Sequence, residues 1–137
     1  MTDETITQAQ ALARVEQLIR DTAAALAPAP QLELIPHGTG TDICLNPNEP
    51  AGKVNVNRAY WLHDVPRSEN LSISRQVKAY WEAQGHVITG TGTGKSPNLS
   101  GESRPDRYIL GLSWSEGDKL FLEATSTCVW PEGIAPK

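Results

Sequence analysis

The stretch that decides the fold is residues 108–128, which read YILGLSWSEGDKLFLEATSTC. It holds two runs in which every second residue is apolar or small, separated by the turn-forming residues 115–118. The alternating set is Tyr108, Leu110, Leu112, Trp114, Leu120, Leu122, Ala124, Ser126 and Cys128. Because successive side chains of a strand point to opposite faces, this pattern predicts a β-hairpin with one buried face. The rest of the chain must supply the layer that covers that face.

An amphipathic helix near the N-terminus is the first part of that layer. Thr7 and Gln10 form a capping box at its start, and Pro28 and Pro30 stop it. Its apolar stripe, with spacings of three and four residues, is Leu12, Val15, Leu18, Ile19, Thr22 and Leu26. A stripe on one side only predicts that the helix lies on a sheet.

A second helix follows the connector 66–71 and ends at Gly85, a residue suited to a left-handed C-terminal position. The candidates for its N-cap are Ser68, Asn70 and Ser72. Its apolar face is Ile73, Val77, Tyr80 and Trp81. Like the first helix, it should cover one face of the sheet.

Shorter segments complete the predicted sheet. Residues 31–35 and 53–62 alternate in polarity, and a further strand begins at residues 87–89. Residues 96–106 are polar and predict a loop, and the chain around Cys44 is expected to be briefly extended. The order is therefore α-β-β-α-β-β-β, which has too few βαβ crossovers for a parallel sheet.

These elements predict a single α+β domain over residues 1–137, with residues 1–6 and 132–137 as flexible ends. The architecture is a two-layer sandwich in which two helices lie on one face of an antiparallel sheet of about four to five strands. The opposite face of the sheet is then open as a possible working surface.

Charge and hydropathy exclude a nucleic-acid partner and a membrane-spanning segment. The chain has 12 Lys and Arg against 16 Asp and Glu, a net charge of −4 and a pI near 5.3. That sign is wrong for a protein that binds nucleic acid through phosphates. No run approaches the roughly 18 apolar residues that a membrane helix needs, and the first residues lack the basic and apolar regions of a signal peptide. We expect no nucleic-acid partner and no transmembrane segment in this chain.

The glycine-rich run 89–96, TGTGTGKS, resembles a phosphate-binding loop without meeting its rule. The position five residues before Gly94 is Thr89 rather than glycine, and Pro97 follows where a helix should begin. A glycine- and threonine-rich strand end is the favoured interpretation. The three histidines are too dispersed for metal-ligand spacing, and no serine lies in a nucleophile elbow, so we expect no metal, no cofactor and no catalytic residue.

Aromatic residues give the candidate binding residues. Tyr60 and Trp61 are neighbours in a strand, so they point to opposite faces and one of them must leave the core. The candidate ligand or partner patch is Tyr60, Trp61, His63, Arg67, Trp114 and Trp130. Aromatic and arginine side chains dominate interface energetics. The alternative is that these residues cover a sheet edge or pack under loops.

Two cysteines, Cys44 and Cys128, lie far apart in sequence and outside any zinc or redox spacing. They either form one disulfide, as in an exported domain, or remain buried thiols. A bridge would close a loop of about 85 residues, worth about 4–5 kcal/mol in the chain-entropy model.

The segment from Tyr108 to Gly133, with its CVWPEG ending at residues 128–133, and the preceding run VKAYWEAQG at residues 77–85 resemble small actinobacterial secreted or lipid-anchored proteins of unknown function. The resemblance implies a place in the cell envelope or outside the cell, supports the Cys44–Cys128 bridge, and would put any lipid anchor upstream of Met1. It brings no assigned activity.

The leading functional hypothesis is a non-enzymatic envelope or secreted domain. It would bind a protein, a cell-wall component or a small ligand through the open face of the sheet and the loops around Pro47 and Pro97. The first alternative is a small hydrolase or transferase that uses His63, Asp64 and Arg67. The second is an intracellular immunity or regulatory protein, in which both cysteines would stay reduced.

Overall fold

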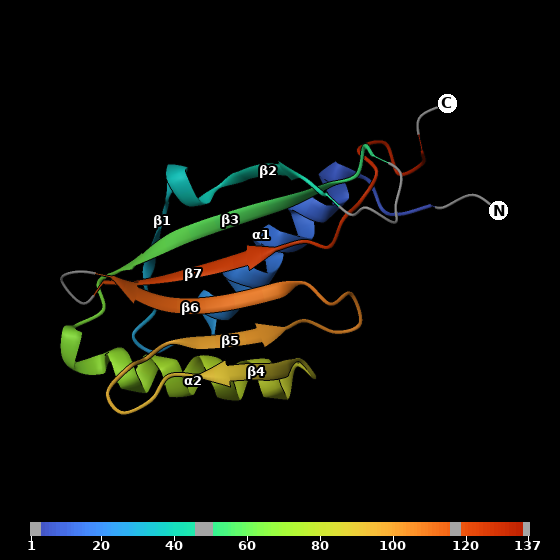
Figure 1. Ribbon diagram of the computed structural model, residues 1–137. Coiled ribbons are helices and arrows are strands. Elements are labelled where there is room, and N and C mark those ends of the chain that lie inside the picture. The colour runs from blue at the N-terminus through green and yellow to red at the C-terminus, as the bar shows by residue number, and fades with distance from the viewer. Residues whose placement is uncertain (1–3, 46–50, 116–118, 136–137) are drawn as a thin grey trace.

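The computed structural model describes residues 4–45, 51–115 and 119–135 (Figure 1). Its helices are α1 (Gln8–Ala24) and α2 (Asn70–Ala83), with two short 3-10 turns, η1 (Pro36–Gly38) and η2 (Arg67–Glu69). Its strands are β1 (Gln31–Leu34), β2 (Gly40–Ile43), β3 (Val54–His63), β4 (Val87–Thr91), β5 (Leu99–Glu102), β6 (Ile109–Ser115) and β7 (Lys119–Thr125). The expected α+β class is confirmed.

The sheet is antiparallel, and in the described part of the chain it has seven strands in the order β1-β3-β7-β6-β5-β4. Strand β2 pairs with the first half of β3, and β1 pairs with its second half. The expected count of four to five strands and the order α-β-β-α-β-β-β were therefore wrong. The chain adds β2 in the extended stretch before Cys44 and β5 inside the segment 96–106 that was expected to be a loop.

Both helices lie behind the same face of the sheet in Figure 1. Helix α1 packs on β3 and β7, whereas α2 packs on β4 and β5. The capping box is present as expected: the Thr7 hydroxyl accepts from the Gln10 amide, and the Gln10 side chain accepts from the Thr7 amide. Helix α2 differs, since it continues directly from η2 and its N-cap position is Glu69, which makes no side-chain cap. None of the three expected capping residues is used there.

A buried layer joins the helices to the sheet. At its centre the Trp81 indole N–H donates to the Thr22 hydroxyl at 2.9 Å, which ties α2 to α1. Gly101 of β5 lies under the Trp81 ring, and a Cβ at this position would be 3.1 Å from ring atom Cε3. The absence of a side chain therefore lets α2 approach the sheet closely. The fully buried core side chains include Val15, Val56, Ile73, Val77, Trp81, Tyr108, Leu110, Leu112, Leu120 and Leu122.

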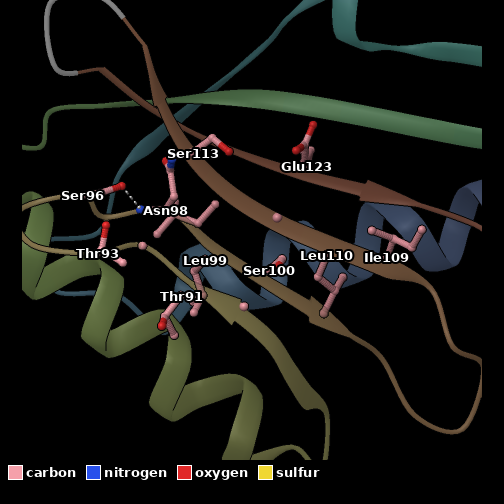
Figure 2. A pocket seen from close by; sticks show the side chains of 14 residues that line it. Thr91, Thr93, Ser96, Asn98, Leu99, Ser100, Ile109, Leu110, Ser113 and Glu123 are labelled. Carbon is pink, nitrogen blue, oxygen red and sulfur yellow. Dashed lines mark hydrogen bonds between the residues drawn. The ribbon is translucent and has the colours of Figure 1, made fainter.

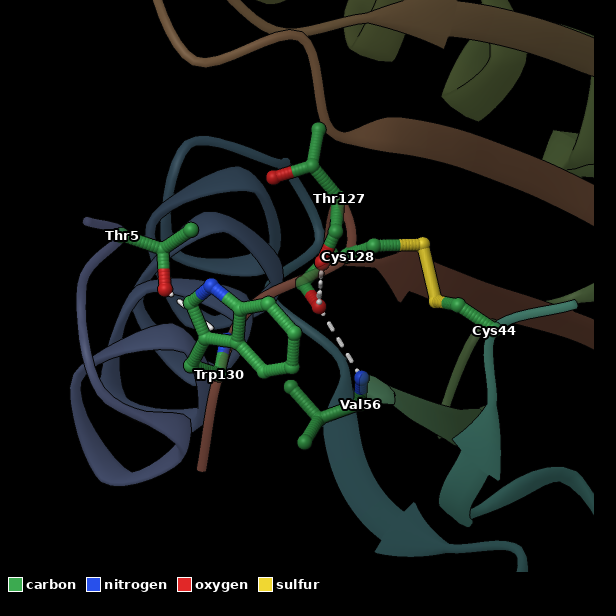
Figure 3. Close-up of a disulfide and its surroundings, with 7 residues drawn as sticks. Thr5, Cys44, Val56, Thr127, Cys128 and Trp130 are labelled. Carbon is green, nitrogen blue, oxygen red and sulfur yellow. Dashed lines mark hydrogen bonds between the residues drawn. A yellow bond between two sulfur atoms is a disulfide. The ribbon is translucent and has the colours of Figure 1, made fainter. Parts of the chain in front are cut away.

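The segment after β7 returns to the start of the chain (Figure 3). The Trp130 amide donates to the Thr5 hydroxyl at 2.8 Å, and the Thr5 amide donates to the Gly133 carbonyl at 2.9 Å. Cys128 forms a disulfide with Cys44, with 6.2 Å between the two Cα atoms. The expected bridge is thus confirmed, and it joins the end of β2 to the segment after β7.

Candidate functional site

The face of the sheet away from the helices carries a row of small residues. Strand pairing aligns Ala59 of β3, Glu123 of β7, Gly111 of β6, Ser100 of β5 and Gly90 of β4. Four of these five residues have either no side chain or a very short one. Ala59 is only 2% exposed, so the open part of the row runs from Glu123 to Gly90, about 14 Å at about 4.8 Å per strand. The outer face therefore has a trough that crosses the strands.

This trough forms the outer groove, a cavity of about 520 Å³ over strands β4 to β7 (Figure 2). Its lining residues are Gly90, Thr91, Gly92, Thr93, Ser96, Asn98, Leu99, Ser100, Ile109, Leu110, Gly111, Leu112, Ser113 and Glu123. The glycine-rich run that resembles a phosphate-binding loop thus forms one end of the groove, as a strand end and a turn. This placement agrees with the interpretation of the run as a glycine- and threonine-rich strand end.

Hydroxyl groups dominate the chemistry of the outer groove. Thr93, Ser96, Ser100 and Ser113 supply hydroxyls, and Asn98 supplies an amide. Thr91 pairs with the buried Leu99, so its side chain lies on the helix side of the sheet and it lines the groove through its backbone. The lining leucines are buried on the helix side and contribute only backbone, which leaves Ile109, 62% exposed, as the apolar side chain at the outer surface. Among the described residues, the lining contains one acid and no Lys, Arg or His. Such a site suits a neutral or cationic polar ligand and disfavours an anion.

Several of these polar groups are free to bind a ligand. Among the residues that the structure describes, the hydroxyl of Ser113 has no hydrogen-bond partner. The Ser100 hydroxyl accepts from Thr89 at 3.1 Å and keeps its own proton to donate. Asn98 accepts from the Trp114 amide through its carbonyl oxygen, so its NH₂ group remains available.

Glu123 is the one charged group in the groove lining within residues 4–45, 51–115 and 119–135. No hydrogen bond or ion pair reaches its carboxylate from residues 4–45, 51–115 or 119–135. The side chain bends over Gly111, where a Cβ would be 2.8 Å from Glu123 Oε1 and 2.9 Å from its Cγ. Partial burial on the sheet raises the pKa of Glu123, because no neighbouring donor offsets the loss of hydration. Gly111 therefore makes room for a carboxylate that has no protein partner.

Two aromatic residues continue the outer face next to the groove. Trp61 of β3 pairs with Phe121 of β7, and Phe121 pairs with the groove residue Ser113. The Trp61 and Phe121 rings meet edge to face, with centroids 5.5 Å apart and an interplanar angle of 79°. Trp61 is only partly buried, so it offers aromatic surface beside the hydroxyl-lined cavity.

The residues of the expected aromatic patch lie in several different places. Tyr60 is buried on the helix side, where its hydroxyl donates to Glu16 at 2.7 Å and its ring lies under Arg20. Trp130 is also buried, with the Lys53 ammonium 5.3 Å from its ring centroid. Of Tyr60 and Trp61, it is Trp61 that leaves the core. Two members of the patch are thus parts of the core rather than of a surface.

His63, Asp64 and Arg67 do come together, around a separate cavity of about 200 Å³ at the end of β3. The His63 ring nitrogen Nε2 lies 2.6 Å from a Glu33 carboxylate oxygen. Trp114, 42% exposed, lines the adjacent cavity of about 340 Å³, which also includes Arg67. Pro97 lies at the edge of that cavity, whereas Pro47 falls outside the described residues.

The sequence interpretation missed the groove residues themselves. The hairpin alternation had placed Gly111, Ser113 and Glu123 on the outer face, and the pairing of Ser115 with Lys119 puts Gly111 opposite Glu123. The sequence feature that could have located the groove is an acidic residue, Glu123, opposite a glycine, Gly111, in the predicted hairpin. The other half of the groove could not be located, because β5 was taken for a loop.

The fold and the groove define a class: a two-layer α+β protein with helices on one face and an open, hydroxyl-lined groove on the other. Within the described ranges, no three His, Cys, Asp or Glu side chains gather to hold a metal ion, and no helix is long and apolar enough to cross a membrane. No family model, curated protein or solved structure matches the chain. The functional assignment therefore rests on the chemistry of the groove.

Proposed function

We propose that this chain is a non-enzymatic binding domain of the cell envelope or the extracellular space, which holds a polyhydroxylated ligand such as a cell-wall glycan in the outer groove. The observation that carries the proposal is the lining, which among the described residues has four hydroxyls, one amide and one carboxylate on the outer face, and no basic residue. Sugars present many hydroxyl groups that both donate and accept, and they need partners of this kind. The row of small residues supplies space for a chain of linked rings across the strands.

The groove favours binding over cleavage. Glycoside hydrolysis ordinarily uses a pair of carboxyl groups, one as an acid and the other as a base or nucleophile. The groove lining has the single carboxyl group of Glu123. The next carboxylate on the outer face, Glu102 of β5, binds Arg107 and Arg104 and is not part of the lining. Among the residues that the structure describes, a ligand held here would meet no second lining carboxyl group for acid–base chemistry.

The location outside the cytoplasm is supported by the Cys44–Cys128 bridge, because structural disulfides persist in oxidising compartments. The same bridge weighs against the intracellular alternative. Protein isolated from its native source should therefore carry no free thiol. Two free thiols in that material would contradict the location.

The binding proposal is tested by calorimetric titration with a panel of oligosaccharides of glucose, mannose, galactose, N-acetylglucosamine and glucosamine. We expect at least one of these to bind. Ser113→Trp should abolish the binding by filling the groove from its floor, because Ser113 is a lining residue without a described partner. Ala79→Trp, on the exposed side of α2, is the matched control and should leave binding intact. Failure of every member of the panel to bind would contradict the proposal.

A further inference from the structure

The Glu123 carboxylate, which has no described partner, indicates which kind of polyhydroxylated ligand the outer groove would bind. We propose that the outer groove selects a sugar chain that carries a free ammonium group, and that Glu123 pairs with this group. The inference rests on the proposed function, since it concerns the same groove, and it adds a charge requirement that the hydroxyl lining alone does not impose.

The first argument is the position of the carboxylate. Glu123 is the second residue of the row Ala59-Glu123-Gly111-Ser100-Gly90 and leans toward Gly111, so its Oε1 lies over the middle of the row. On one side it has Ala59, and on the other it has a glycine. No neighbouring residue of the row can reach the carboxylate with a donor.

The second argument is the surrounding charge. The other carboxylate on this part of the face, Glu102, is paired with Arg107 at 3.1 Å and with Arg104, so those cations are already engaged. Lys95 lies next in sequence to a lining residue, yet it lines the neighbouring cavity with Trp114. Within the described part of the chain, therefore, no protein cation lies in the groove to neutralise Glu123.

The third argument is energetic. A partly desolvated carboxylate without a partner is unfavourable, and the raised pKa of Glu123 has the same origin. A charge-assisted hydrogen bond from an ammonium group relieves this cost more strongly than a neutral hydroxyl does. An anionic sugar would instead be repelled. The hydroxyls of Ser100 and Ser113 remain for the sugar ring that carries the ammonium group.

The test compares two tetramers that differ in charge at each ring. The glucosamine tetramer carries free ammonium groups, and the N-acetylglucosamine tetramer carries neutral amides in their place. At pH 6 in moderate salt we expect the glucosamine tetramer to bind about tenfold or more tightly than its acetylated form. Glu123→Gln should remove this preference. Glu82→Gln, which neutralises an exposed acid on α2, changes the net charge equally and should keep it.

The stability of the variant is a useful second readout. Because the Glu123 carboxylate is only partly hydrated and has no described partner, Glu123→Gln should leave the melting temperature unchanged or raise it. A loss of binding in a variant of undiminished stability cannot be attributed to misfolding. If Glu123→Gln lowered the melting temperature substantially, the carboxylate would have a partner within the protein, which would contradict the inference.

Spermidine, a cation without hydroxyl groups, separates the inference from the proposed function. Equal binding of both tetramers, blocked by Ser113→Trp, would overturn the ammonium requirement and leave the glycan-binding function standing. Binding of spermidine as tight as that of the glucosamine tetramer, dependent on Glu123, would support the charge requirement and contradict a sugar-binding groove. If Glu82→Gln also lost the preference for the glucosamine tetramer, the preference would come from nonspecific attraction to an acidic protein, and the inference would be overturned.

Discussion

Replacing Cys44 and Cys128 together with alanine should destabilise the protein mainly through its unfolded state. The two residues are 84 positions apart, and the chain-entropy model gives about 4.6 kcal/mol at 25 °C for a loop of that length. Backbone bonds hold the same region without the bridge: the Cys44 amide donates to Lys53, and Val54 and Val129 exchange two bonds of 2.9 and 2.8 Å. The native structure should therefore persist in the variant, and the change should appear as a lower free energy of unfolding.

The assay is thermal and urea unfolding followed by far-UV circular dichroism. With an unfolding entropy of about 2.1 cal/mol/K per residue over 137 residues, a loss of about 4.6 kcal/mol corresponds to about 15 °C in melting temperature. Wild-type protein in reductant should match the variant, and reductant should not affect the variant. A loss below about 1 kcal/mol in both experiments would refute the reasoning.

Three further expectations follow from individual contacts. Trp81→Phe should lower the free energy of unfolding by about 2–3 kcal/mol, because it removes the buried hydrogen bond to Thr22 and part of the core packing. A double-mutant cycle with Thr22→Val, measured by urea unfolding, should show strong coupling between the two positions. Thr7→Ala should cost about 1 kcal/mol in the same assay, because it removes the N-cap of α1; an unchanged midpoint would contradict the capping role. Burial acts to raise the pKa of Asp106, but hydrogen bonds, chiefly from Arg14, outweigh it and hold the pKa below its usual value. The free energy of unfolding should therefore fall as pH drops below about 4. Asp106→Asn should make this fall with pH less steep.

The parts of the fold that could be predicted are those in which local pattern and tertiary packing agree. The capping box at Thr7, the stripe of α1 and the alternation of β6 and β7 all follow from periodicity, and each survives in the structure. The left-handed Gly85, with φ of 86°, ends the turn after α2 as expected. These features depend on residues close together in the chain.

Strand β5 shows why the rest could not be predicted. Its sequence, Leu99-Ser-Gly-Glu102, lacks β-branched and aromatic residues and contains a glycine that weakens a strand in isolation. It is a strand because β4 and β6 pair with it on both sides, and its glycine is needed by the Trp81 ring that packs on it. Both causes are long-range contacts that propensity does not encode.

The open face that carries the candidate site could be predicted from the sequence, whereas the residues that line the outer groove could not. One open face opposite the helices follows from one-sided stripes, but aromatic content drew attention to Tyr60 and Trp130, which are 7% and 1% exposed. The Tyr60 hydroxyl donates to Glu16 on the helix side. Burial of an aromatic residue depends on what the fold brings over it. A groove made by the absence of side chains leaves almost no signal in a sequence unless the strand register is known.

The measurement that tests the central claim most directly is an NMR titration of isotopically labelled protein with the glucosamine tetramer, following the backbone amides. Binding in the outer groove should shift the amides of Gly90, Ser100, Gly111 and Ser113, which come from three different strands and all line this cavity. The amides of α1 should stay in place. An absence of shifts at saturating ligand, or shifts confined to the helices or to the cavity around His63, would contradict the account.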